Sequence, residues 1–214
     1  MKKQAVNLGR IGILLPIAAI IPYLGNLAGL GALILLLISF HNFSKFYETP
    51  AIFNKALVGF ILPIAGSIVG GIILAITAVS AVSSVTKAGE TSFSNLENLG
   101  NMFAQSSVSI SVAAIIMLAA SIIGLYFLLK SMKMLTEKSG IKHFKTAGSL
   151  YFIGMIVTTI IFAVIMVLFF MPSVDISPFI AFLLLIGCVI NLIGWIFHII
   201  AYFTIKTDEK LPEK

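Results

Sequence analysis

The chain is poor in charge: only 10% of its 214 residues are Asp, Glu, Lys or Arg, against about 25% in an ordinary soluble domain. This shortage excludes a soluble globular protein and a disordered chain. It also excludes a nucleic-acid-binding domain, so we expect no nucleic acid among the partners. The one cysteine, Cys188, excludes an internal disulfide and a thiolate metal cluster.

What the chain has instead is apolar residues, which make up 59% of it. Charged residues are absent from five stretches: 11–44, 56–86, 98–129, 146–174 and 176–205. Because about 20 apolar residues cross a bilayer as a helix, these stretches predict at least five spanning helices. The sequence therefore predicts an all-α fold, a polytopic helical membrane bundle that forms one integral membrane domain over residues 1–214.

The first uncharged stretch, 11–44, would be about 51 Å long as one helix, whereas the hydrocarbon core is about 30 Å thick. Pro22, Gly25 and Asn26 lie in its middle, and these residue types favour a break or a turn. We therefore expect two short helices, near 5–22 and near 26–46. They would form a re-entrant or tilted hairpin, and the sequence leaves its depth open.

Lysine and arginine predict the orientation, because they are enriched in cytoplasmic loops. The segment 130–145 carries five lysines and is therefore placed inside. If 11–44 is a hairpin, thirteen of the fourteen basic residues lie on that side. We expect about six membrane segments in the cell (cytoplasmic) membrane, with both termini inside. The external loop 87–107 is then a candidate for a short surface helix or, alternatively, a ligand-binding lid.

Helix boundaries follow from local signals. Thr49 and Pro50 predict the start of the third helix, and Ser139-Gly140 predicts the end of the fourth. The fifth and sixth helices are expected near 146–170 and 178–205. Phe53-Asn54-Lys55-Ala56 and Phe144-Lys145-Thr146-Ala147 hint at an internal repeat, a feature of many transporters.

Three groups of residues are candidates for function. Gly66 and Gly70 lie one turn apart and predict close helix packing, within the chain or across a dimer. The lysines of 130–145 either contact anionic lipid head groups or only fix the topology: Lys130, Lys133, Lys138, Lys142 and Lys145. One polar stripe follows the helical period in the sixth helix: Cys188, Asn191, Trp195, His198 and Tyr202.

The stripe has two interpretations: hydrogen bonds to neighbouring helices, or a polar path or pocket. No catalytic motif is present, since the uncharged stretches hold no carboxylate pair and the chain no His-Glu-x-x-His. A site made of His41, His143 and His198 is conceivable, but nothing in the sequence brings the three together. We thus expect no enzyme activity, no cofactor and no metal.

The chain resembles a known family over most of its length. The similarity lies in 24–29, in 33–40, in the stretch 43–56 (Phe-Ser-Lys-Phe-Tyr-Glu-Thr-Pro-Ala-Ile-Phe-Asn-Lys-Ala), and later in Ser139-Gly140, 144–148 and Gly154. In these residues the chain resembles the prokaryotic membrane proteins grouped as domain of unknown function 996. The resemblance implies a multi-span membrane protein of unassigned activity, and it carries over no catalytic residue.

The hypothesis from the sequence is a non-enzymatic membrane protein that acts through helix packing and contacts with lipid or partners. The partners would be membrane lipids and a second copy or another membrane protein. The alternative is a transporter or channel for a small solute. A water-accessible cavity at Asn191 and His198 would favour transport, and a dry stripe between helices would favour packing.

Overall fold

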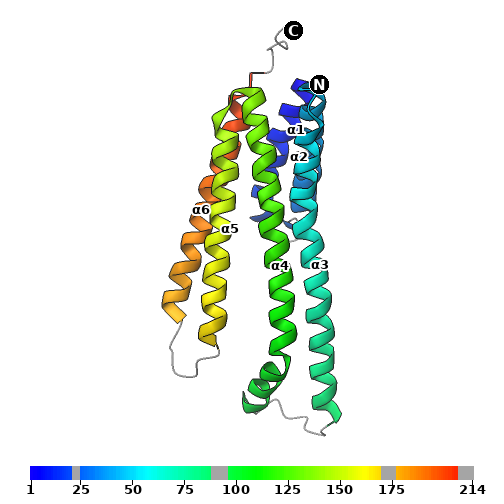
Figure 1. The fold of residues 1–214 in the computed structure, drawn as a ribbon, viewed down its shortest axis with the longest axis vertical. Coiled ribbons are helices and arrows are strands. Elements are labelled where there is room, and N and C mark those ends of the chain that lie inside the picture. Colours follow the sequence, from blue (N-terminus) through cyan, green and yellow to red (C-terminus); the bar gives the residue numbers. More distant parts are fainter. Residues whose placement is uncertain (21–24, 88–95, 170–176, 207–214) are drawn as a thin grey trace. The chain divides into compact units, whose positions relative to one another are not determined.

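The computed structural model describes residues 1–20, 25–87, 96–169 and 177–206, and Figure 1 shows their fold. All regular structure in these residues is helical, which confirms the all-α fold class. In chain order the elements are α1 (Lys2–Leu14), the 3₁₀ helix η1 (Leu15–Ile20), α2 (Gly25–Phe46), α3 (Pro50–Lys87), α4 (Leu96–Ser139), α5 (Lys142–Phe169) and α6 (Ser177–Thr204).

Five helices in the described residues are long and apolar enough to cross a membrane. Their candidate spans are Leu27–Phe46, Pro50–Ser80, Val108–Ser139, Lys142–Ile161 and Leu185–Thr204. Each is at least 20 residues long, which suffices for a hydrocarbon core of about 30 Å. The chain is therefore a multi-pass helical membrane protein, while the count of six segments and the orientation stay predictions.

The helices fall into two compact units. The first unit comprises Met1–Phe60 and Gly124–Lys214, and the second comprises Ile61–Ile123. The first holds α1, α2, α5, α6 and the adjoining ends of α3 and α4. The second holds the remaining parts of α3 and α4. Each unit is described by itself, and the expectation of a single domain stays a prediction.

The first helix ends earlier than predicted. We expected a helix to about residue 22, but α1 ends at Leu14 and η1 follows it. Pro16 explains the change, because it has no N–H to donate to the Gly12 carbonyl. The chain continues in the tighter 3₁₀ form, which is common at helix ends. The predicted break at Pro22 lies outside the described residues.

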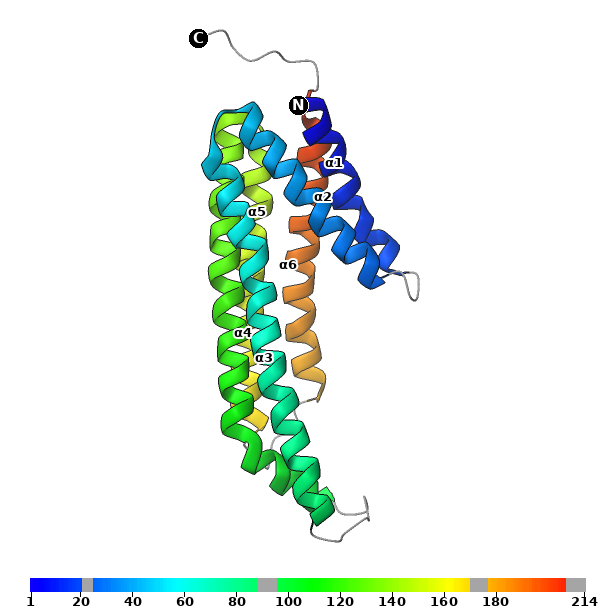
Figure 2. The same cartoon turned by 90° about the vertical axis from the view of Figure 1, so that its right-hand side faces the viewer.

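α2 runs back along α1, so the two helices form an antiparallel hairpin within the first unit (Figure 2). The Lys2 ammonium lies 5.5 Å from the centre of the Phe46 ring, which brings the first residues of α1 beside the last residue of α2. The beginning of α1 and the end of α2 therefore lie together at one end of the first unit, as the charge pattern predicted.

The two turns at this end lie where they were predicted. Pro50 is the first residue of α3, but the Thr49 hydroxyl donates to the Tyr47 carbonyl at 2.9 Å, and the first turn of α3 is closed by the Ile52 N–H donating to the Thr49 carbonyl at 3.1 Å. Gly140 follows α4 with φ of 73°, a left-handed conformation that glycine adopts without steric cost. Its N–H donates to the Thr136 carbonyl at 2.8 Å. The predicted external loop differs in part, because its residues from Leu96 onward are the beginning of α4.

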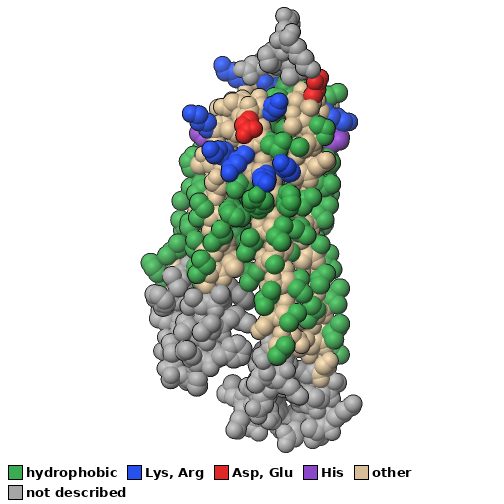
Figure 3. All heavy atoms as spheres, viewed as in Figure 1, with side chains coloured by type: hydrophobic (Ala, Val, Ile, Leu, Met, Phe, Trp, Pro, Cys, Tyr) green, Lys and Arg blue, Asp and Glu red, His purple; other side chains and the backbone are tan. Residues whose placement is uncertain are grey.

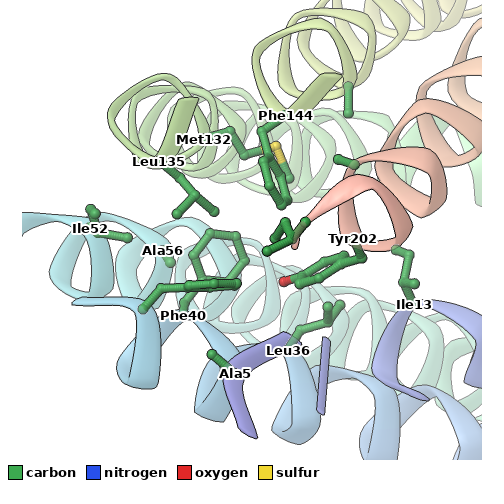
Figure 4. Close-up of a cluster of buried hydrophobic side chains, with 14 of the residues drawn as sticks. Ala5, Ile13, Leu36, Phe40, Ile52, Ala56, Met132, Leu135, Phe144 and Tyr202 are labelled. Carbon is green, nitrogen blue, oxygen red and sulfur yellow. The ribbon is translucent and has the colours of Figure 1, made fainter. Parts of the chain in front are cut away.

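The buried core of the first unit draws on all six α-helices (Figure 4). Its largest fully buried side chains are aromatic and aliphatic: Tyr202, Phe40, Phe43, Phe144, Ile52, Met132 and Leu135. The Phe144 and Tyr202 rings meet edge to face with centres 5.3 Å apart, a geometry that aromatic pairs favour. The core therefore holds the α1–α2 hairpin, the α5–α6 pair and the ends of α3 and α4 together.

Candidate functional site

The predicted stripe on α6 divides into a buried and a more exposed part. Tyr202 and His198 are buried, with 0% and 2% of their surfaces exposed. Trp195 and Asn191 are half-buried, and Cys188 is exposed. Four of the five predicted residues therefore face neighbouring helices to some degree, and Cys188 does not share that environment.

Tyr202 is bonded to α2 through Ser39. The Ser39 hydroxyl donates to the Ala5 carbonyl at 2.7 Å, and the Ser39 and Tyr202 hydroxyl oxygens lie 3.1 Å apart. Because Ser39 gives its proton to the carbonyl, the Tyr202 hydroxyl is the donor of the second bond. Ser39 and Tyr202 are fully buried, so these bonds satisfy groups that would otherwise be costly in the interior.

Gly9 on α1 makes room for the Tyr202 ring. A Cβ placed at Gly9 would overlap three ring carbons of Tyr202, so no larger residue fits without moving the ring. The Tyr202 hydroxyl and its ring thus engage different helices of the hairpin: the hydroxyl bonds to Ser39 of α2, and the ring packs on Gly9 of α1.

Trp195 bonds to the end of α1. Its indole N–H donates to the Ile13 carbonyl at 3.0 Å. The last four carbonyls of an α-helix have no partner within the helix, and Ile13 is one residue from the end of α1. Trp195 therefore satisfies a carbonyl that is left free where Pro16 ends the α-helix.

Arg10 makes the reciprocal bond from α1 to the end of α6. Its Nε donates to the Tyr202 carbonyl at 3.1 Å, one of the last carbonyls of α6. The guanidinium carbon lies 5.0 Å from the centre of the Phe203 ring, within range for a cation–π interaction. A cation at a helix C-terminus also interacts favourably with the helix dipole. We call these bonded residues (Ala5, Arg10, Ile13, Ser39, Trp195, Tyr202) the polar seam.

His198 lies next to the polar seam and is surrounded by rings. It stacks on Tyr202 with ring centres 5.3 Å apart, and Phe144 and Tyr151 meet its ring edge to face. Its Nδ1 lies 3.4 Å from the Tyr151 hydroxyl oxygen, which is a long contact for a hydrogen bond. Its buried Nε2 has no hydrogen-bond partner in the structure.

Asn191 belongs to the contact between α5 and α6. Its side-chain N–H donates to the Gly187 carbonyl one turn earlier, at 2.9 Å. The amide packs on Gly154 of α5, where a Cβ would lie 2.8 Å from either amide atom. On the next turn Gly187 faces Thr158 in the same way, with 2.6 Å from a Cβ to the hydroxyl oxygen. Small residues thus let these two helices approach closely.

The five predicted lysines are exposed. Figure 3 shows Lys and Arg gathered in one band near the end where α4 finishes, with hydrophobic side chains directly beside the band. The Lys130 ammonium lies 4.6 Å from the centre of the Tyr126 ring. This band corresponds to the basic side of the predicted topology.

The predicted glycine pair lies against α4 within the second unit. A Cβ at Gly66 would overlap the Ala120 Cβ, and one at Gly70 would overlap Met117. A Cβ at Gly71, the next residue in the sequence, would have no atom within 4 Å. The glycines therefore permit a close α3–α4 contact inside the chain, and a dimer contact through them stays a prediction.

Ser39, Arg10 and Tyr151 were not among the residues predicted from the sequence. Ser39 is a polar residue within an apolar helix, and Arg10 is the last charge before the first uncharged stretch; both are visible signals. Tyr151 gave no signal apart from its residue type. Within the described residues, no group of three or more His, Cys, Asp or Glu could hold a metal ion.

Comparison with known proteins identifies the family. A family model described as "Protein of unknown function (DUF996)" matches residues 28–171. The chain belongs to this family. The matched DUF996 region begins within α2, includes all of α3, α4 and α5, and leaves out α1 and α6, so two elements of the polar seam lie outside it.

A relative extends the similarity over nearly the whole chain. The chain is 24% identical over 208 residues to "Uncharacterized protein MJ1644" of Methanocaldococcus jannaschii, covering 97% of this chain and 95% of the relative. No solved structure matches the chain. The DUF996 assignment therefore establishes a family of unknown function and assigns no activity to any residue.

Proposed function

We propose that the chain is a non-enzymatic protein of the cell membrane that acts through helix packing and through contacts with lipid and protein partners. The observation that carries the proposal is the polar seam. Its polar groups bond to one another or to backbone carbonyls of neighbouring helices. These bonds hold the helices together.

The chemistry of Ser39 supports this proposal. A serine nucleophile needs an adjacent base that takes its proton. Ser39 instead donates its proton to the Ala5 carbonyl, which is no base at physiological pH. Its other neighbour, the Tyr202 hydroxyl, is a donor in this arrangement. Ser39 is thus placed to join helices.

The outer surface supports contacts within the membrane. Large aliphatic side chains are well exposed on the hairpin and on α6, for example Leu27 at 68% and Leu185 at 59%. Such residues suit lipid tails or the apolar face of another membrane protein. The basic band beside them suits anionic head groups.

Native mass spectrometry of the protein in lipid nanodiscs, combined with crosslinking in intact membranes, tests the proposal. We expect a defined oligomer or a defined complex with another membrane protein. A strictly monomeric protein without a crosslinked partner would contradict the proposed role. An Ala substitution at exposed Cys188 serves as a neutral control, because its side chain makes no contact in the seam.

One observation favours a second candidate, transport of a small neutral or hydrophobic solute. Among the described residues, His41 Nδ1, Thr159 Oγ1 and His198 Nε2 are buried without a hydrogen-bond partner, as expected of groups that receive a polar ligand. A liposome flux assay with small neutral solutes distinguishes the two. Saturable flux that His198→Phe abolishes supports transport, and flux equal to empty liposomes removes this candidate.

A further inference from the structure

Two lysines mark the same boundary on neighbouring helices. Lys55 comes directly before the uncharged stretch 56–86 of α3, and Lys130 comes directly after the uncharged stretch 98–129 of α4. The two antiparallel helices touch between these points, where a Cβ at Gly59 would lie 2.9 Å from the Leu128 backbone nitrogen. Both lysines therefore lie at the level where the apolar surface ends.

A third lysine lies on the same part of α4. The Lys130 ammonium lies over the Tyr126 ring at 4.6 Å from its centre. Lys133 follows two helical turns after Tyr126 on the same face of α4, and the Lys55 ammonium of α3 reaches α4 at the Met134 sulfur, 3.5 Å away. We call Lys55, Lys130 and Lys133 the three-lysine cluster.

The ammonium of Lys130 extends toward the apolar stretch. Tyr126 lies one helical turn before Lys130, on the apolar side of it. A lysine at a membrane boundary normally extends its charge away from the lipid tails. The opposite direction keeps this charge beside the last turn of the apolar stretch.

Two lysines of the cluster contact weakly polar groups of the protein: Lys130 contacts an aromatic side chain and Lys55 a thioether. Lys55 donates to the Met134 sulfur at 3.5 Å, and a thioether is a weak acceptor. Tyr126 itself is 42% exposed, so an anion can reach the cluster from the membrane.

We propose that the three-lysine cluster and the Tyr126 hydroxyl bind the phosphate group of an anionic phospholipid. The ammonium groups would neutralise the phosphate, and the apolar surfaces of α3 and α4 beside it would contact the acyl chains. The exposed apolar surface beside the cluster favours a lipid over a soluble phosphate. This inference rests on the lipid contacts of the proposed function and names their position and chemistry.

Titration of phosphatidylglycerol into the detergent-solubilised protein, read by native mass spectrometry at physiological ionic strength, tests this site. The test variant carries Lys55→Gln, Lys130→Gln and Lys133→Gln. The matched control removes the same charge from the α4–α5 turn, with Lys138→Gln, Lys142→Gln and Lys145→Gln. Phosphatidylcholine is the neutral reference lipid.

We expect the test variant to lose about tenfold or more in affinity, since each lysine near a lipid phosphate contributes about fivefold. The control should lose about twofold or less, because salt screens exposed charges away from the site. Tyr126→Phe should weaken binding less than the triple substitution. Unchanged emission of Trp195 would confirm that each variant is folded.

Three results would overturn the inference. Equal losses in the test and control variants would indicate diffuse attraction by surface charge. Unchanged affinity in a folded test variant would exclude the cluster. Displacement of the lipid by inorganic phosphate would indicate a soluble ligand. None of these depends on whether the protein forms an oligomer, so the proposed partner contacts are tested separately by crosslinking.

Discussion

Gly9 of α1 lies against the ring of Tyr202, and replacing its hydrogen with a methyl group should loosen the α1–α2 hairpin from α6. The Cβ of Gly9→Ala would overlap three ring carbons. The ring cannot easily retreat, because Tyr202 is fully buried and its hydroxyl is held by Ser39 at 3.1 Å.

The expected cost has two parts. An extra methyl group in a well-packed core costs about 1–3 kcal/mol. Displacing the ring also weakens a hydrogen bond between helices, which is worth about 0.6–1.7 kcal/mol in a membrane protein. Together they predict that Gly9→Ala destabilises the folded protein by about 2–4 kcal/mol.

Trp195 gives a direct readout of this loss. It is the single tryptophan of the chain, and its indole bonds to the Ile13 carbonyl of the same hairpin. Its emission during thermal unfolding in detergent micelles should show a lowered midpoint for Gly9→Ala, and a shift at low temperature if the hairpin detaches first.

Gly29→Ala is the matched control, because no atom lies within 4 Å of a Cβ at Gly29 on α2. It should change the stability by no more than about 0.5 kcal/mol. Equal midpoints for Gly9→Ala and the wild-type protein would refute the packing of Tyr202 on α1. Equal losses in both variants would show that the effect comes from glycine itself.

Three further predictions test other contacts. Trp195→Phe removes the indole donor and should cost about 0.6–2 kcal/mol, measured by circular dichroism during heating; no change would mean that its bond is not formed. Gly66→Ala should separate α3 from α4 and lower the unfolding midpoint, whereas Gly71→Ala should not; a reversed order would contradict the glycine contact. In a Cys188→Ser background, Lys142→Cys should react with a membrane-impermeant maleimide only after permeabilisation; labelling in intact cells would invert the orientation.

The fold class was predictable because it depends on summed properties. Five long uncharged stretches require membrane helices whatever their neighbours are, and the turn at Gly140 follows from local backbone preference. The hairpin was predictable from the turn-forming residues in 11–44 together with the charge pattern, and Lys2 and Phe46 meet as that hairpin requires. These inferences needed no knowledge of which helices touch.

The end of the first helix and the partners of the stripe were less predictable. Pro16 could be read in the sequence as a helix breaker, but the Trp195 indole, which bonds to the Ile13 carbonyl at the end of α1, comes about 180 residues later in the chain. The helical period placed His198 and Tyr202 on one face. It could not show that Ser39 would be the partner of Tyr202, because that contact depends on how the hairpin packs.

The contact between Ser39 and Tyr202 is the centre of the polar seam, so its coupling energy tests the account most directly. A double-mutant cycle with Ser39→Ala and Tyr202→Phe isolates the energy that the two hydroxyl groups share. We predict a favourable coupling of about 0.5–1.7 kcal/mol in the free energy of unfolding. Strictly additive losses would contradict the claim that buried polar groups here hold the helices together.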